Sequence, residues 1–319
     1  MGTAMPQQSR QILEPTDVQF TSGGLSCSAW LYRPLGDGPF PVIVMGHGLG
    51  GTKRMRLPAF AEQFAAAGYA CLVFDYRHFG DSEGEPRQLL DIGRELEDWK
   101  AAVAYARSLD NVDPAKIILW GSSFGGGHVL STAADDPRLA AVICQCPFTD
   151  GVASSLAMNP VTLLKLTVLA LRDRIGSWLC AKPVMVATAG RPGTTALMNA
   201  PDAYDGYLGI MPPDGGVPNH VAARFALDII RYFPGRRTPQ IRSPILFCVC
   251  DTDSVAPAKT TLRHASRAPR HEIKRYVDGH FDIYVGKAFE RVVRDQLDFL
   301  RRTVPPRISS RRHQPGAHE

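Results

Sequence analysis

Residues 119–127 read LWGSSFGGG and place two adjacent serines among glycines, directly after the apolar run KIILW. By composition alone, a Gly/Ser-rich segment is an ordinary loop. The segment also matches the pattern G-x-S-x-G at Gly121, Ser123 and Gly125, which is typical of a sharp strand-to-helix turn that exposes a serine hydroxyl as a nucleophile. The chemistry expected of such a serine is attack on a carbonyl carbon.

The motif has the sequence context that this turn requires. It follows KIILW, which we predict to be a buried strand, and it precedes a predicted helix from Phe124 to about residue 134. Gly121 and Gly125 lack the Cβ atoms that would collide where a strand and a helix approach closely. Ser122 falls on the variable position of the pattern, so we assign the nucleophile to Ser123.

A serine hydroxyl needs a general base, and the base needs an acid that fixes its tautomer. In enzymes built on this turn, the acid and then the histidine follow the serine along the chain. The histidines that come late enough stand at positions 264, 271, 280, 313 and 318. We predict His280 as the base, because the segment DGHFDIY places it in a loop between the last predicted strand and the last predicted helix.

The acid is expected where the strand PILFCVC ends, and two aspartates in CDTDSVAP follow that strand. We predict Asp253 as the acid and assign Asp251 to capping of the turn. The oxyanion that develops during acyl transfer also needs preset N–H donors. We predict the backbone N–H groups of Phe124 and of Leu49, which lies in the glycine-rich segment MGHGLGGTK. His47 in the same segment is interpreted as structural, because a base before the nucleophile would break the expected order.

Short, almost entirely apolar strands alternate with amphipathic helices around the motif. VQFTS and CSAWLYRP, separated by a Gly-Gly turn, predict an N-terminal hairpin. The later predicted strands are PVIVMGH, YACLVFDYR, KIILW, AAVICQC, SPILFCVC and HEIKRYV. The alternation predicts an α/β fold with a mostly parallel, doubly wound sheet that helices cover on both faces.

The alternation stops between residues 147 and 240. We expect this stretch to be a helical cap inserted between strands 6 and 7, with helices near 160–172 and 221–233. The resulting division is a first core part (17–146), the cap (147–240), a second core part (241–302) and a disordered basic tail (303–319). The side chains expected to line a binding cavity under the cap are Leu163, Leu164, Leu166, Leu169 and Met198.

Composition argues against several classes of protein. The net charge of the 319 residues is +5, but residues 301–319 supply +4 of it, so no nucleic-acid partner is expected. No run of about 18 apolar residues predicts a membrane span, and the first residues lack the apolar run of a secretory signal, so we expect a cytoplasmic protein. The seven cysteines, which include the C-x-C pairs 144/146 and 248/250, lie mostly in apolar runs. We interpret them as buried thiols and expect neither a metal nor a cofactor.

Five segments occur in the order GHGLGG, FDYRHFGDSEG, GSSFGG, CDTDSVAP and GHFDIY. In this order they resemble the α/β-hydrolase superfamily over residues 17–302. Within it the chain is similar to dienelactone hydrolases, to Xaa-Pro dipeptidyl peptidase-like hydrolases, and to fungal polyketide transferases and thiohydrolases. The resemblance implies the α/β-hydrolase fold, and it implies that Asp75 and Ser82 shape a turn after the fourth strand rather than take part in chemistry.

The residues and the resemblance together predict a carboxylesterase-like serine hydrolase that cleaves a hydrophobic ester or thioester through an acyl-enzyme on Ser123. An acyltransferase or thioesterase of a biosynthetic pathway would use the same residues. A non-catalytic ligand-binding protein can also retain this fold. A peptidase is less expected, because nothing in the sequence supplies a site for a peptide amine. The oligomeric state stays open, with a dimer as one possibility.

Overall fold

The computed structural model describes residues 14–306 and is built around an eight-stranded central sheet. Its strands are β1 (Thr16–Ser22), β2 (Leu25–Tyr32), β3 (Phe40–Gly46), β4 (Ala70–Phe74), β5 (Val112–Ser122), β6 (Ala141–Gln145), β10 (Ile245–Cys250) and β11 (His271–Tyr276). Their spatial order is β1-β2-β4-β3-β5-β6-β10-β11. β2 pairs antiparallel with β1 and β4, whereas all the other pairings are parallel. The mostly parallel sheet and the N-terminal hairpin are therefore confirmed.

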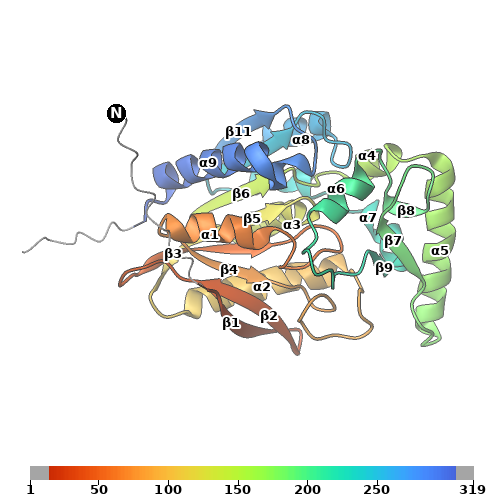
Figure 1. Cartoon of the computed structure of the whole chain (residues 1–319), viewed down its shortest axis with the longest axis horizontal. Helices are drawn as coiled ribbons and strands as arrows, with labels where there is room; N and C mark the ends of the chain where they lie inside the picture. Colours follow the sequence, from red (N-terminus) through yellow and green to blue (C-terminus); the bar gives the residue numbers. More distant parts are fainter. Residues whose placement is uncertain (1–13, 307–319) are drawn as a thin grey trace, which may run out of the picture.

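Helices cover both faces of this sheet. They are α1 (Leu57–Ala66), α2 (Ile92–Ser108), α3 (Phe124–Asp135), α8 (Ala258–Ala265) and α9 (Gly286–Thr303). α1 packs against α9, and α2 packs against α3 (Figure 1). The ring of Phe60 on α1 meets Trp120 of β5 at 4.9 Å, and Trp99 on α2 meets Phe74 of β4 at 5.1 Å. The strands β3, β4, β6 and β10 are buried at every residue, which explains why they are apolar throughout rather than alternating.

The chain leaves the central sheet after β6 and returns at β10, the seventh strand of that sheet along the chain. The intervening elements are α4 (Gly151–Leu156), α5 (Pro160–Trp178), β7 (Met185–Ala189), β8 (Ala196–Met198), α6 (Ala203–Gly209), β9 (His220–Ala222), the 3₁₀ helix η1 (Ala223–Phe225), α7 (Ala226–Ile229) and the 3₁₀ helix η2 (Pro234–Gln240). They gather at one end of the molecule, with α5 as the outermost element (Figure 1). The insertion point predicted for the cap is thus confirmed.

The predicted helical cap contains strands in addition to its helices. β8, β7 and β9 form a second, three-stranded sheet inside the cap. The helix predicted at 221–233 is replaced by β9, η1 and the four-residue α7. The backbone N–H of Ala222 donates to the Gln88 carbonyl at 2.9 Å, and that of Ala223 donates to Val184 at 2.8 Å. The backbone N–H groups of this segment therefore find their hydrogen-bond partners in segments distant in sequence while the segment stays extended. This tertiary pairing outweighs the helical pattern of the local sequence.

The end of the described chain also differs from expectation. α9 runs to Thr303, and Val304, which we predicted to lie in a disordered tail, is buried and accepts a hydrogen bond from the Tyr69 hydroxyl at 3.1 Å. The rest of the predicted tail, residues 307–319, lies outside the described residues. None of the helices in the described range combines the length and the apolarity needed to span a bilayer.

Candidate active site

Ser123 lies between the last residue of β5 and the first residue of α3. Its backbone has φ 55° and ψ −121°, a conformation that residues other than glycine rarely adopt. Its N–H donates to the Gln145 carbonyl at 2.9 Å, and its carbonyl accepts the N–H of Phe148, also at 2.9 Å. Hydrogen bonds to the end of β6 and to the residues that follow it therefore hold the strained turn in place.

Two glycines let the neighbouring segments approach this turn. A Cβ atom on Gly125 would collide with the carbonyl oxygen of His47, and one on Gly121 would collide with the carbonyl oxygen of Gly125. The strand, the helix and the loop after β3 consequently leave room only for glycine at both positions. The lack of room for a Cβ atom is the physical reason for both glycines of the G-x-S-x-G pattern in this chain.

The structure brings Ser123, His280 and Asp253 into one chain of hydrogen bonds. His280 Nε2 lies 2.9 Å from Ser123 Oγ, and His280 Nδ1 lies 2.7 Å from Asp253 Oδ2. The side chains of His280 and Asp253 are almost completely buried, at 1% and 2% exposure. With the imidazole proton on Nδ1, the ring donates to the carboxylate and Nε2 is free to accept the serine proton.

Backbone amides fix the orientation of the Asp253 carboxylate. Its second oxygen, Oδ1, accepts the N–H of Val255 at 2.8 Å and the N–H of Ala256 at 2.6 Å. The alternative Asp251 lies on the surface, where its carboxylate pairs with the Arg275 guanidinium at 2.8 Å instead of capping the turn. Only Asp253 of the two aspartates therefore reaches the imidazole.

Ser122, the neighbour of Ser123, takes part in a separate hydrogen-bonded group. Its hydroxyl is hydrogen-bonded to the Tyr284 hydroxyl and accepts the amide N–H of Gln145 at 3.3 Å. Tyr284 belongs to the short helix η3 (Asp282–Tyr284), which directly follows the His280 loop. This contact attaches the histidine loop to the end of β5.

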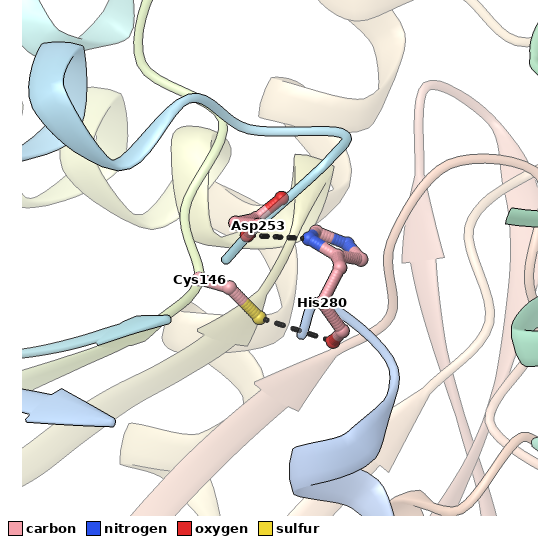
Figure 2. A group of neighbouring side chains, drawn as sticks. All are labelled: Cys146, Asp253 and His280. Carbon is pink, nitrogen blue, oxygen red and sulfur yellow. Dashed lines mark hydrogen bonds and ion pairs between the residues drawn. The ribbon is translucent and has the colours of Figure 1, made fainter. Parts of the chain in front are cut away.

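Cys146 lies beside Asp253 and His280, as Figure 2 shows. Its Sγ is 3.7 Å from the backbone carbonyl of His280, and one ligand-type atom from each of Cys146, Asp253 and His280 lies within 4.8 Å of the others. A cation there would have to displace the proton between Nδ1 and the carboxylate. Burial, the largest cause, also raises the pKa of the Cys146 thiol well above its ordinary value, so the thiol stays protonated. The cluster fits a role in holding the His280 loop better than a metal site.

The two predicted oxyanion donors lie next to Ser123. Leu49, Ser123 and Phe124 line the same cavity, and a Cβ on Gly48 would lie 3.4 Å from Ser123 Oγ. His47 is buried, its Nδ1 lies 2.9 Å from the Gly48 carbonyl, and its ring packs edge-on against Tyr76 at 4.5 Å. Burial lowers the pKa of His47, so the imidazole is neutral at pH 7. Through these contacts, His47 stabilises the loop that carries Leu49.

Asp75 and Ser82 make contacts that belong to the fold. The buried Asp75 carboxylate accepts two hydrogen bonds from Lys53: one from the side-chain ammonium at 2.8 Å and one from the backbone N–H at 2.6 Å. The Ser82 hydroxyl donates to the Asp75 carbonyl at 2.8 Å and accepts the Ser28 N–H at 2.8 Å. The contacts connect the segment after β4 to β2 and to the loop after β3.

A cavity of about 1110 Å³ opens next to Ser123 between the cap and the central sheet. Residues of α4, α5, β8 and α7 line it together with Phe124 and Phe148 of the core. Leu163, Leu166 and Met198 are among the lining residues, as predicted. Leu164 is not: it is 65% exposed on the outer side of α5, while Leu169 packs against the core. The prediction failed for these two because successive helical residues point about 100° apart and only packing decides which face is inward.

A second, much smaller chamber of about 30 Å³ touches both Ser123 and His280. The side chains of Met55, Tyr207 and Phe281 are among those that enclose it. This volume is sufficient to hold water. Ser123 thus lies between a large, mostly apolar cavity and a small chamber.

Sequence reasoning missed a buried polar group between α2 and α3. His128 of α3 lies 2.7 Å from the Glu95 carboxyl of α2 and 2.9 Å from the hydroxyl of Tyr232, which follows α7. Burial raises the pKa of Glu95 well above its ordinary value and lowers that of His128 to about 3. Burial therefore disfavours the charged form of both groups, and their hydrogen bonds attach the end of the cap to two core helices. Only the polar residues inside two otherwise apolar helix faces hinted at this group.

The family model for the alpha/beta hydrolase fold matches residues 41–288. The chain therefore belongs to the α/β-hydrolase fold family, as the motif order indicated. The same architecture occurs in the crystal structure of the α/β hydrolase GrgF from Penicillium sp. sh18, with a TM-score of 0.77 and 26% identity, covering 91% of this chain and 99% of that one.

Two relatives of known name are more similar in sequence. The quorum-quenching protein AidA of Acinetobacter baumannii (strain MDR-ZJ06) is 72% identical over 291 residues, which cover 91% of this chain and 96% of that protein. The acyltransferase drtE of Aspergillus calidoustus is 37% identical over 302 residues, which cover 90% and 95% of the two chains. The similarity thus spans nearly the full length of both relatives, the cap included.

Proposed function

We propose that this chain is a serine hydrolase that cleaves the ester or thioester bond of a hydrophobic acyl compound through an acyl-enzyme on Ser123. The observation that carries the proposal is the continuous hydrogen-bonded chain from Ser123 through His280 to Asp253 at the wall of a large, mostly apolar cavity. Its hydrolase class is supported by membership of the α/β-hydrolase fold family.

In the proposed mechanism, Ser123 Oγ attacks the substrate carbonyl carbon while His280 Nε2 takes the hydroxyl proton. Asp253 holds the imidazole in the required tautomer and stabilises its positive charge. The backbone N–H groups of Leu49 and Phe124 bind the oxyanion of the tetrahedral intermediate. The intermediate collapses as His280 gives its proton to the leaving alkoxide or thiolate. A water molecule, deprotonated by His280, then releases the acid and restores the serine.

The two cavities suggest where the acyl chain and the hydrolytic water bind. We place the acyl chain in the cavity of about 1110 Å³ under residues 147–240, which we propose to act as the cap that selects it. We place the hydrolytic water in the chamber of about 30 Å³ that touches Ser123 and His280. A chamber of this size admits water beside Ser123 and His280, as hydrolysis requires.

The name of the 72% identical relative supports a narrower proposal for the substrate. That protein is named for quorum quenching, and we propose that this chain likewise destroys an acylated signal molecule. We propose that its scissile bond is an ester, in an open chain or within a lactone ring, whose carbonyl carbon Ser123 attacks. Acyl transfer is the second candidate function, supported by the name of the 37% identical relative.

The first test labels the purified protein with a fluorophosphonate probe, using Ser123→Ala and Ser122→Ala as a matched pair. We expect stoichiometric labelling of the wild type and of Ser122→Ala, and none of Ser123→Ala. An unlabelled wild type would point to a ligand-binding protein instead, and undiminished labelling of Ser123→Ala would refute the assignment of the nucleophile.

The second test measures hydrolysis of p-nitrophenyl esters and of N-acylated lactones over a series of acyl chain lengths. We expect a rate maximum at a medium or long chain that fills the cavity. A flat profile near background would count against esterase activity. Addition of alcohol or thiol acceptors then separates the two candidate functions, because a transferase forms the new ester or thioester in preference to the free acid.

The proposed place of action is the cytoplasm. All seven cysteines are free thiols, and only Cys180 is exposed, which suits a reducing compartment. Cell fractionation with an antibody against the chain tests this proposal.

A further inference from the structure

The outer face of α5 carries a row of exposed apolar side chains. The opposite face of the same helix is buried against the rest of the cap through Thr162, Leu166 and Ala170. The exposed row, here called the α5 stripe, is between 47% and 75% accessible and consists of Val161, Leu164, Val168, Leu171, Ile175 and Trp178. Because α5 is the outermost element of the cap, no other part of the described chain covers the stripe (Figure 1).

The spacing of the α5 stripe identifies the kind of partner. Its residues follow one another in steps of three, four, three, four and three, so the stripe repeats about every 3.5 residues, which is the spacing of a coiled-coil seam. The positions beside it are polar or basic, namely Lys165, Thr167, Arg172 and Arg174. A stripe this narrow fits a single helix better than a broad lipid surface.

We propose that the α5 stripe is the interface of a homodimer in which two copies of α5 pack antiparallel about a two-fold axis. The stripe is symmetric about the midpoint between Val168 and Leu171. An antiparallel copy therefore places Val161 opposite the partner's Trp178, Leu164 opposite the partner's Ile175, and Val168 opposite the partner's Leu171. A two-fold interface requires such self-complementarity, because each contact must occur twice.

The exposed area of the α5 stripe is consistent with a dimer interface. The exposed fractions of its six side chains correspond to about 700 Å² per copy, close to the about 800 Å² per partner of a standard stable interface. The largest apolar patch of an ordinary monomer covers about 300–600 Å². Leu156 and Leu179, both about three-quarters exposed near the ends of the stripe, extend the apolar surface further.

The charges beside the stripe oppose self-association only weakly. Antiparallel packing brings Lys165 near the partner's Arg172, so like charges face each other at the rim. Both residues are exposed, and exposed charges in water interact only weakly and are screened by salt. The dimer is therefore expected to tighten as salt rises. Docking of the same basic helix on an anionic membrane would weaken with salt.

The interface also adjoins the cavity beside Ser123. Leu171 and Trp178 belong to the α5 stripe and line that cavity, so a second copy would cover this side of its mouth. A change in the oligomeric state is consequently expected to change the preferred acyl chain length. The dimer itself does not depend on the proposed function, because it can be measured without any substrate.

The first experiment measures the mass of the full chain in solution by sedimentation velocity over a range of concentrations and salt. We expect a dimer that tightens with salt, and we expect Leu164→Glu to weaken association at least 100-fold. The matched control is Leu35→Glu, the same substitution at a 70% exposed leucine between β2 and β3, which should leave the dimer intact. A wild type that is monomeric at all concentrations overturns the proposal, as does a Leu164→Glu variant that folds and still forms the dimer.

The second experiment tests the antiparallel arrangement by disulfide cross-linking in a Cys180→Ser background, since Cys180 is the one exposed cysteine. A mixture of Val161→Cys and Trp178→Cys chains should cross-link under mild oxidation, and Val161→Cys alone should not. Cross-linking of Val161→Cys alone would overturn the antiparallel arrangement. Flotation of a monomeric wild type with phosphatidylglycerol vesicles, abolished by Leu164→Glu, would assign the stripe to a membrane surface and overturn the dimer.

Discussion

The substitution Asp253→Asn isolates the role of the acid, because it conserves shape and removes only charge and acceptor capacity. In the native site, Asp253 Oδ1 accepts the N–H groups of Val255 and Ala256, while Oδ2 accepts His280 Nδ1–H. An asparagine keeps both backbone bonds only if its oxygen takes the Oδ1 position. Its NH₂ group then faces Nδ1, so the imidazole must carry its proton on Nε2, and Nε2 can no longer accept the Ser123 proton.

The expected loss of kcat follows from the free-energy cost of turning the asparagine amide to the opposite orientation. Turning the amide restores the correct tautomer but leaves two backbone donors unpaired, at about 1–3 kcal/mol each. The total of about 2–6 kcal/mol corresponds to a fall in kcat between about 30-fold and 10⁴-fold. The upper end matches the loss known for this substitution in serine proteases, about 10⁴-fold.

The assay compares kcat and KM for a p-nitrophenyl ester in wild type, Asp253→Asn and Asp251→Asn. Asp251→Asn is the matched control, because it changes an aspartate two residues away that pairs with Arg275 on the surface. We expect the control to keep wild-type kcat and Asp253→Asn to lose at least 30-fold with little change in KM. A folded Asp253→Asn variant with kcat within a few-fold of wild type would refute the reasoning.

Three further predictions follow from buried contacts. Gly125→Ala should lose at least about 3 kcal/mol of unfolding free energy in urea, or fail to fold, because its Cβ would collide with the His47 carbonyl; a stable variant would contradict the packing described for the turn. The raised pKa of Glu95 means that its neutral form contributes stability below pH 4.5, which is lost as the pH rises towards the folded pKa, while His128 stays neutral. Glu95→Gln should therefore gain unfolding free energy relative to wild type, by up to about 1.4 kcal/mol per pH unit, as the pH rises above the ordinary glutamate pKa of 4.5. A difference in urea unfolding that stays constant with pH would contradict the raised pKa. Leu163→Trp, which adds volume inside the cavity, should move the rate maximum to shorter acyl chains, and an unchanged chain-length profile would place the acyl chain elsewhere.

Much of the fold and the candidate site could be predicted because the signals are local. The apolar runs of β3, β4, β6 and β10 reveal strands covered on both faces, and Gly121 and Gly125 reveal the tight turn around Ser123. The positions of Asp253 and His280 just beyond predicted strands place both at the same edge of a parallel sheet, and there the structure brings them together. Their catalytic roles remain a prediction.

Within the cap, the sequence determined little beyond its place in the chain. Its short strands are extended because hydrogen bonds from Ala222 and Ala223 reach partners far away in sequence, and no local pattern contains that information. Packing decided that Leu163 faces the cavity while Leu164 faces outward. Backbone donors at Val255 and Ala256 hold Asp253 against His280, whereas Asp251 turns to the surface. A sequence encodes residue types and periodicity, but which side of an element is buried and which donors meet a given carboxylate depend on neighbours that only the folded chain supplies.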